Sequence, residues 1–112
     1  MKSRLIFPLA VILCAPLVTA NAGDLEAGRA KAEIFCQTCH GMDGQATTDM
    51  VAHISGQQKE YLIIQLQAYR SGKRQHEQMS IIAGSLSDDD IENLAEWYSS
   101  IEVTVKIPDY EN

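Results

Sequence analysis

Apolar residues recur at helical spacing in three stretches of the chain. The first stretch runs from about Asp24 to Cys36, the second from about Gln58 to Arg70, and the third follows Ser87. In each stretch apolar or small residues return every three or four positions, which places them on one face of a helix. In chain order they are Leu25, Gly28, Ala32, Phe35 and Cys36; Tyr61, Leu62, Leu66 and Tyr69; and Ile91, Leu94, Ala95, Tyr98 and Ile101. The pattern predicts three amphipathic helices.

Local signals at the helix ends and one interior glycine refine this picture. Ser87 precedes three aspartates, which is typical of an N-cap followed by acids that complement the helix dipole. The second helix is expected to stop at Ser71-Gly72. Gly28 lies inside the first helix, where glycine costs about 1 kcal/mol relative to alanine. We therefore expect Gly28 to permit a close crossing by another helix.

The segments between the predicted helices, residues 41–56 and 72–84, show no regular pattern. No stretch alternates convincingly enough for a sheet, and Val103, Val105 and Ile107 make only a short extended tail. The expected fold class is all-α, with three main helices and long loops. Loops of this length in a small domain need something to fold around.

Residues 1–22 have the features of a secretory signal peptide. Lys2 and Arg4 precede an uncharged apolar run from Leu5 to Ala20, and a small-x-small cleavage pattern ends at Ala22. The run is shorter than the roughly 17–25 residues of a membrane span, and two prolines interrupt it. We therefore expect cleavage after Ala22 rather than a retained membrane anchor. The protein would then be periplasmic, with one domain over residues 23–112.

The length and the net charge of the chain exclude some classes of protein. The full chain of 112 residues allows one small domain and excludes a multidomain enzyme. The charges before Asp24 are both positive, so residues 23–112 carry a net charge of −8 rather than the −6 of the full chain. This balance argues against nucleic-acid binding, which requires a basic patch. A domain of this size often needs a disulfide, metal or cofactor to complete its core.

The segment Cys36-Gln37-Thr38-Cys39-His40 has the C-x-x-C-H spacing of c-type haem attachment. Two thiols about one helical turn apart can add to the two vinyl groups of one porphyrin, and the adjacent histidine then lies beneath the iron. Two other uses of the cysteines compete. A thioredoxin-like redox pair requires a βαβ context that the sequence does not show. A zinc site would need two of the three histidines His40, His53 and His76, at irregular spacings and without a second close cysteine pair. Haem attachment is therefore the favoured interpretation, with Cys36 and Cys39 as thioethers and His40 as an axial ligand.

The second axial ligand is an open choice among several methionines and histidines. The candidates are Met42, Met50, His53, His76 and Met79. Met42 is too close to His40 in the sequence to reach the opposite face of the haem. Met79 follows the second predicted helix, in a polar segment where core packing does not explain a methionine. We favour Met79, then His76, then an open coordination site; a His/Met pair raises the reduction potential.

With these residues the chain resembles a class I c-type cytochrome, in particular the small bacterial periplasmic group of cytochrome c553 and the single halves of cytochrome c4. The resemblance runs from about Gly23 to Ser100. Beyond the C-x-x-C-H segment, the matching positions include Gly56-Gln57, Tyr61-Leu62, Gln65-Leu66, Tyr69, Gly72-Lys73-Arg74, Met79, Leu86 to Ile91, Leu94-Ala95 and Trp97-Tyr98. It implies a small cytochrome c fold around one covalently bound haem, with the first and last helices crossing through Gly28 and Trp97.

The family also implies a backbone carbonyl that holds the ring of the haem histidine. Many relatives carry a proline near this carbonyl, and the corresponding residue here is Ala52. Such a bond would set the orientation and basicity of His40. Tyr61, Gln65 and Arg74 are candidate partners of the haem propionates, with an ordinary polar helix face as the alternative.

These features predict an electron-transfer protein rather than an enzyme. A haem with both axial positions filled has no place for a substrate, so the remaining chemistry is the transfer of single electrons. The family resemblance implies that they pass through an exposed haem edge near the thioethers, with Met42 and the residues around Gln78 as candidate docking positions. The net negative charge suggests redox partners with a basic docking patch, and we expect a monomer or weak dimer. The alternatives are an electron-transfer subunit of a larger oxidoreductase, or a haem enzyme or sensor with open or weakly ligated iron.

Overall fold

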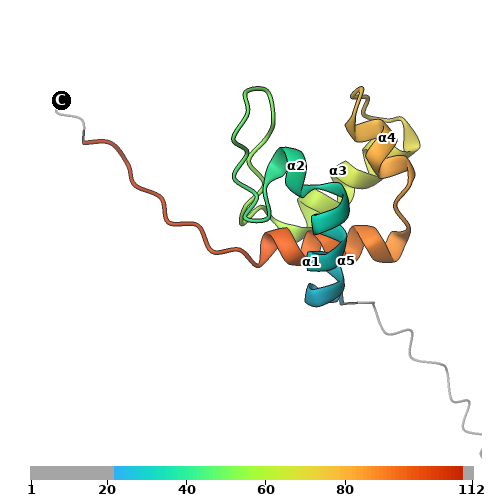
Figure 1. Ribbon diagram of the computed structural model, residues 1–112, viewed down its shortest axis with the longest axis horizontal. Coiled ribbons are helices and arrows are strands. Elements are labelled where there is room, and N and C mark those ends of the chain that lie inside the picture. The colour runs from blue at the N-terminus through green and yellow to red at the C-terminus, as the bar shows by residue number, and fades with distance from the viewer. Residues whose placement is uncertain (1–21, 110–112) are drawn as a thin grey trace, which may run out of the picture.

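The computed structural model describes residues 22–109, so the predicted signal peptide lies outside the described residues except for Ala22. Five helices follow one another in this part of the chain (Figure 1). They are α1 (Leu25–Phe35), α2 (Gln37–His40), α3 (Lys59–Ser71), α4 (Met79–Gly84) and α5 (Asp88–Ser99). No strand is present in residues 22–109, which confirms the all-α prediction. In the same residues, none of the helices has both the length and the apolar character that crossing a membrane requires.

The three predicted helices are confirmed as α1, α3 and α5, and so are the two end signals predicted at Ser87 and at Ser71-Gly72. Asp24 caps α1, because its side chain accepts a hydrogen bond from the Ala27 N–H at 2.8 Å. Ser87 and Asp90 form a reciprocal capping box at the start of α5. Gly72 ends α3 in a left-handed conformation with φ of 80°. Local side-chain chemistry therefore fixes these boundaries to within about a residue.

Two short helices, α2 and α4, lie outside the three that the sequence pattern predicted. With four and six residues, they are too short to show an apolar period. The prediction that residues 72–84 form a loop is wrong for its second half, and Met79 is the first residue of α4. The Nδ1 atom of His76 accepts hydrogen bonds from the N–H groups of Gln78 and Met79, both at 3.3 Å. These bonds satisfy backbone donors that a helix start otherwise leaves unpaired.

Helix α1 crosses α5 (Figure 1), and Gly28 lies at the crossing. A Cβ atom on Gly28 would lie only 2.0 Å from the Asn93 carbonyl oxygen and 3.1 Å from Cβ of Trp97. The two backbones can approach this closely only because residue 28 has no side chain. The expected crossing of the first and last helices through Gly28 and Trp97 is therefore confirmed.

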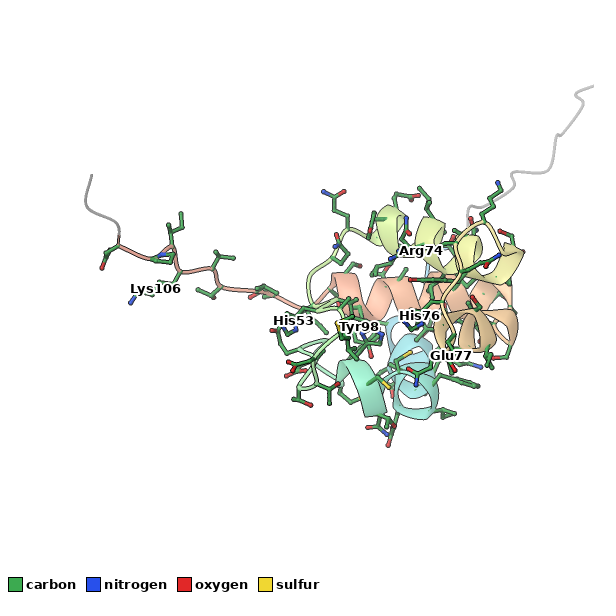
Figure 2. The ribbon with its side chains drawn as sticks, turned by 90° about the horizontal axis from the view of Figure 1, so that it is seen from above. His53, Arg74, His76, Glu77, Tyr98 and Lys106 are labelled. Atoms are coloured by element: carbon green, nitrogen blue, oxygen red, sulfur yellow. The ribbon has the colours of Figure 1, made fainter. Side chains whose placement is uncertain are left out.

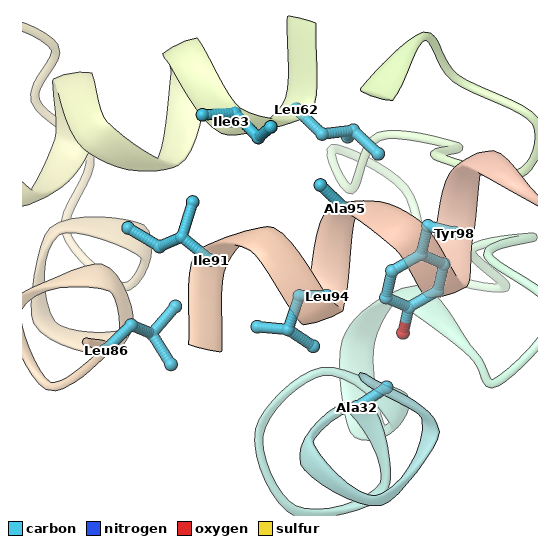
Figure 3. Close-up of a cluster of buried hydrophobic side chains, with 8 residues drawn as sticks. All are labelled: Ala32, Leu62, Ile63, Leu86, Ile91, Leu94, Ala95 and Tyr98. Atoms are coloured by element: carbon cyan, nitrogen blue, oxygen red, sulfur yellow. The ribbon is translucent and has the colours of Figure 1, made fainter. Parts of the chain in front are cut away.

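A small hydrophobic core lies between α1, α3 and α5 (Figure 3). It consists of Ala32, Leu62, Ile63, Leu86, Ile91, Leu94, Ala95 and Tyr98. Among the described residues, the largest side chain that is fully buried is Ile91, so the protein chain alone buries little large apolar volume. Several core side chains, among them Leu62, Leu94 and Tyr98, also line a large cavity. The hydrophobic core is therefore continuous with the apolar lining of this cavity.

Candidate functional site

The C-x-x-C-H segment forms a tight helical turn at the end of α1. The Cys36 N–H donates to the Ala32 carbonyl at 2.9 Å and closes α1, and α2 begins at the next residue. The His40 N–H then donates to the Cys36 carbonyl, also at 2.9 Å. Because of this turn, Cys36, Cys39 and His40 all line the same cavity.

The ring of His40 is held from the opposite loop. Its Nδ1 atom lies 2.8 Å from the Ala52 carbonyl oxygen, which can only accept, so Nδ1 carries the proton. The Nε2 atom is then the unprotonated nitrogen available to a metal. The family resemblance placed Ala52 where many members carry a proline near this carbonyl, and the structure identifies the carbonyl of Ala52 itself as the partner.

The cavity has a volume of about 680 Å³ and receives residues from all five helices. This volume lies within the range of about 300–1,000 Å³ that is typical of cofactor sites. In Figure 1, α2 and α4 lie apart, and both line the cavity. The apolar lining consists mainly of Phe35, Val51, Ile54, Leu62, Leu66, Ile81, Ile82, Leu86, Leu94 and Ala95. An apolar wall with a few convergent donors suits a large, flat, mostly apolar group.

Of the candidates for the second axial ligand, four line this cavity. They are Met50, His53, His76 and Met79. Met42 instead packs against the hydrophobic core, in agreement with its exclusion from the sequence. Helix α4 begins at Met79, so its side chain comes from an element separate from α2.

The other three candidates differ from Met79 in exposure or in the contacts of their rings. The Nδ1 atoms of His53 and His76 accept backbone N–H groups, from Ala46 at 3.0 Å for His53 and from Gln78 and Met79 at 3.3 Å for His76. Both rings thus hold their own loops, and in the view of Figure 2 they lie on either side of Tyr98. Met50 is 99% exposed and has a left-handed backbone with φ of 68°. Met79 is partly buried.

Cys36 differs from Cys39 in its surroundings. Burial raises the pKa of the Cys36 thiol to about 11; a hydrogen bond with Tyr98 lowers it, and the neighbouring Cys39 raises it. Cys39 is exposed, and both residues are free thiols. The two sulfur positions therefore offer one protected and one accessible thiol on the same wall of the cavity.

Zinc is a poor fit to this donor set. Within residues 22–109, no three His, Cys, Asp or Glu side chains come close enough together to hold a metal ion. A thioredoxin-like site also lacks its βαβ context, since the described part of the chain has no strand. Two thiols, an imidazole fixed through Nδ1 and a thioether around an apolar cavity match the donors of a c-type haem.

Comparison with known proteins agrees with this assignment. Residues 23–97 match the family model described as cytochrome c oxidase, cbb3-type, subunit III. The chain is 40% identical over 84 residues to cytochrome c-554(548) of Halomonas halodenitrificans, covering 72% of this chain and 100% of that protein. The chain belongs to the c-type cytochromes. The cofactor of this family is covalently bound haem c, and the cavity residues described above are the candidates for binding it.

Other relatives of this cytochrome are longer. Cytochrome c4 of Pseudomonas aeruginosa is 35% identical over 88 residues, covering 79% of this chain and 43% of that protein. The thiosulfate dehydrogenase electron acceptor of Stutzerimonas stutzeri is 33% identical over 69 residues, covering 59% of this chain and 32% of that protein. The cytochrome thus spans less than half the length of these two relatives.

Arg74 is the one formally charged residue among those that line the cavity in the described chain, counting Asp, Glu, Lys and Arg. Its guanidinium donates to Gln65 Oε1 at 2.5 Å and lies 4.7 Å above the Tyr69 ring. Gln65, Arg74 and Tyr61 all line the cavity, so the structure brings together the three residues named as candidate propionate partners.

Sequence reasoning anticipated one functional contact in this site only in part and missed another. The family resemblance implied a carbonyl near Ala52, but residue type gives almost no signal for which backbone group supplies it. Tyr98 was placed only on the apolar face of the last helix, but its hydroxyl donates to the Gly41 carbonyl at 3.0 Å. A tyrosine rather than a leucine at a buried helical position was the available signal, because a buried hydroxyl usually finds a partner.

Proposed function

We propose that this cytochrome is a periplasmic carrier of single electrons, with Cys36 and Cys39 as the haem thioethers and His40 and Met79 as the axial ligands of the iron. One observation carries the proposal. All four residues line a single apolar cavity in a chain that belongs to the c-type cytochromes.

The chain's own residues would bind and orient the cofactor. Two thioether bonds from one helical turn would fix the haem to α2, and the hydrogen bond from Nδ1 of His40 to the Ala52 carbonyl leaves Nε2 available to hold the iron. Bound haem supplies one-electron chemistry by cycling between Fe(III) and Fe(II). The apolar lining excludes water, which limits reorganisation when the charge on the iron changes.

Met79 is the preferred sixth ligand because the His76 ring is already held by hydrogen bonds and Met50 is almost fully exposed. His76 caps the start of α4 with Nδ1, and moving its ring would give up two hydrogen bonds to that helix. Met50 lines the cavity at its solvent-accessible side and is 99% exposed. Met79 is the partly buried donor on a helix separate from the one that carries His40.

The experiment compares Met79→Ala with Met50→Ala in the haem-loaded protein. The oxidised wild type should show the weak far-red absorption band of a sulfur–iron(III) bond. Met79→Ala should abolish this band and lower the reduction potential, because a thioether stabilises Fe(II). Met50→Ala is the matched control and should retain both. An unchanged band in Met79→Ala would show that another residue is the ligand.

The periplasmic location rests on the predicted signal peptide and on haem attachment. We expect the mature protein to begin at Gly23, as a single domain of residues 23–112. N-terminal sequencing of the protein from the periplasmic fraction tests this directly. An uncleaved Met1 in a membrane fraction would contradict it.

The proposed partners are redox proteins with a basic docking patch, and the proposed state is a monomer or weak dimer. The net charge of −8 over residues 23–112 would steer such partners at long range. The cavity lining, in contrast, is almost uncharged apart from Arg74. The net charge would bring a redox partner to the protein, and the contact at the haem edge would itself be almost uncharged. This combination is typical of short-lived complexes between redox proteins.

A second candidate function is that of an electron-transfer subunit in a larger oxidoreductase. The description of the matching family model, a subunit of an oxidase, favours it. Gel filtration of the native periplasmic fraction separates the two functions. A carrier elutes near the mass of the free domain, whereas a subunit elutes with a larger complex.

A further inference from the structure

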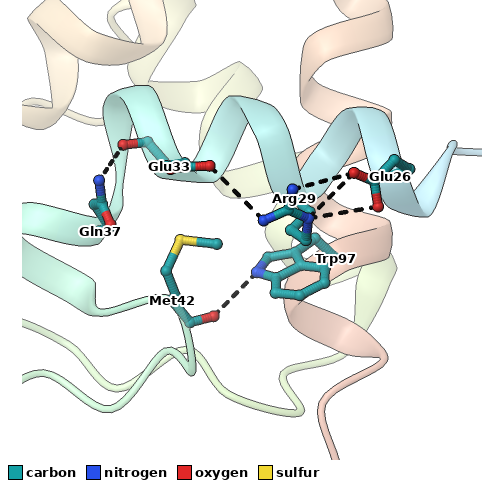
Figure 4. A network of polar contacts seen from close by, with 6 residues as sticks. All are labelled: Glu26, Arg29, Glu33, Gln37, Met42 and Trp97. Carbon is teal, nitrogen blue, oxygen red and sulfur yellow. Dashed lines mark hydrogen bonds and ion pairs between the residues drawn. The ribbon is translucent and has the colours of Figure 1, made fainter.

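Tyr98 and Trp97 are consecutive residues of α5 whose polar atoms both reach the segment after His40. Tyr98 is only 2% exposed, and its hydroxyl donates to the Gly41 carbonyl at 3.0 Å. The Trp97 indole N–H donates to the Met42 carbonyl at 3.0 Å (Figure 4). Two neighbouring side chains thus bind the two carbonyls that directly follow His40.

Helix α2 needs such support. It has four residues, and so short a helix is not stable by its own hydrogen bonds. Gly41 caps it with φ of 76°, and the Gly41 N–H donates to the Gln37 carbonyl at 2.9 Å. The Gly41 carbonyl has one further donor, the Gly44 N–H at 3.3 Å. The Tyr98 hydroxyl is therefore the shorter of two hydrogen bonds at this carbonyl, and the one that comes from another helix.

The same hydroxyl also lies beside a proposed attachment point. Tyr98 and Cys36 lie close enough for each side chain to raise or lower the pKa of the other, and both line the cavity. A single buried side chain of α5 thus contacts the first residue and the last carbonyl of the turn that carries the proposed haem ligands.

We propose that Tyr98, assisted by Trp97, is a positioning residue that locks the end of α2 onto α5 and thereby fixes His40. The Ala52 carbonyl holds the imidazole ring, and the two aromatic donors hold the backbone that carries it. This inference rests on the proposed role of His40 as an iron ligand. It adds that the ligand is oriented by α5, the helix that also crosses α1 at Gly28.

The test uses the haem-loaded protein with Tyr98→Phe, and Trp97→Phe as a second variant in case the first does not fold. Tyr69→Phe is the control, since the Tyr69 ring lines the same cavity and its ring contacts are to Arg74 and His76. Hydrogen exchange is followed by NMR in the reduced protein at three sites: the Gly41 amide, the His40 Nδ1–H and, as a reference, the Leu62 amide in α3. Loss of one buried hydrogen bond should speed exchange at the first two sites about threefold to tenfold.

The result expected is local. Tyr98→Phe, and to a smaller extent Trp97→Phe, should speed exchange at Gly41 and His40 beyond any change at Leu62, whereas Tyr69→Phe should not. Equal acceleration at all three sites would show a merely structural role and overturn the proposal. Unchanged exchange at Gly41 and His40 would overturn it as well.

The proposed function is read out separately in the same samples. In the oxidised wild type, the ring protons of His40 should show large paramagnetic shifts if His40 binds the iron. Their absence would contradict the ligand assignment, whatever the exchange rates at Gly41 show.

Discussion

The ammonium group of Lys31 on α1 lies 2.9 Å from Oδ1 of Asp90 on α5. The other carboxylate oxygen of Asp90 accepts from the Ser87 N–H at 3.0 Å, and the Asp90 N–H donates to Ser87 Oγ at 3.1 Å. One carboxylate therefore completes the cap of α5 and joins that helix to α1. Burial raises the pKa of Asp90, but the bonds from Lys31 and Ser87 outweigh it, so the pKa lies below the ordinary value.

This arrangement predicts that Asp90→Asn destabilises the protein by about 1 kcal/mol at neutral pH. A carboxyl with a lowered pKa in the folded state stabilises above its unfolded pKa, and this contribution is lost as the pH falls through the folded pKa. The free energies of unfolding of wild type and variant should therefore begin to converge as the pH falls below the unfolded pKa of about 3.9, and should meet only below the lower folded pKa. Denaturant titrations at neutral and acidic pH measure the difference. Glu102→Gln, in the exposed tail, is the control and should show no such convergence.

Gly28→Ala should be more damaging than any surface change. The added Cβ would meet the Asn93 carbonyl oxygen at 2.0 Å, so the α1 and α5 backbones must move apart. We expect a loss of roughly 1–3 kcal/mol in the free energy of unfolding. Gly84→Ala is the control, because nothing lies within 4 Å of its added Cβ. If both variants unfold at the same denaturant concentration, the helix crossing does not depend on the missing side chain.

Each of the two proposed thioether bonds can be tested on its own. Cys36→Ala and Cys39→Ala should each leave the haem attached through a single bond. An unreacted vinyl group extends the conjugation of the porphyrin, so the α band of the reduced pyridine haemochrome should move to longer wavelength. The double variant should release its haem on acid–acetone extraction. A single variant with an unshifted band would show that its cysteine forms no thioether.

Small redox reagents of opposite charge test the proposed electrostatic steering. The Debye length falls from about 30 Å at 0.01 M salt to about 8 Å at 0.15 M, which screens the protein's net negative charge. Oxidation of the reduced protein by the cationic tris(phenanthroline)cobalt(III) complex should become slower as salt is added. Oxidation by anionic ferricyanide should become faster. Rates that do not depend on salt for either reagent would argue against steering by the net charge.

The main helices and the motif were readable from the sequence because their signals are local. Periodic apolar positions and the Ser87 cap fix α5 without reference to the rest of the fold. The C-x-x-C-H spacing likewise carries its chemistry within five residues. The role of Gly28 in the helix crossing could also be predicted, because a glycine inside a helix usually allows another backbone to approach closely.

The missed features depend on contacts between distant segments. Helix α4 is too short for a periodic signal, and it begins where the His76 ring caps it. The target of the Tyr98 hydroxyl is a carbonyl 57 residues earlier in the chain, which no local pattern indicates. Sequence reasoning could therefore name Met79 but not the helix that carries it.

Carbon monoxide binding to the reduced wild-type protein at neutral pH tests the central claim most directly. With both His40 and Met79 bound, the iron has no free position, and we expect no change in the absorption spectrum on the time scale of mixing. The Met79→Ala variant, prepared in parallel, should bind carbon monoxide readily. Rapid binding by the wild type would contradict an electron carrier with six-coordinate iron and favour a haem enzyme or sensor.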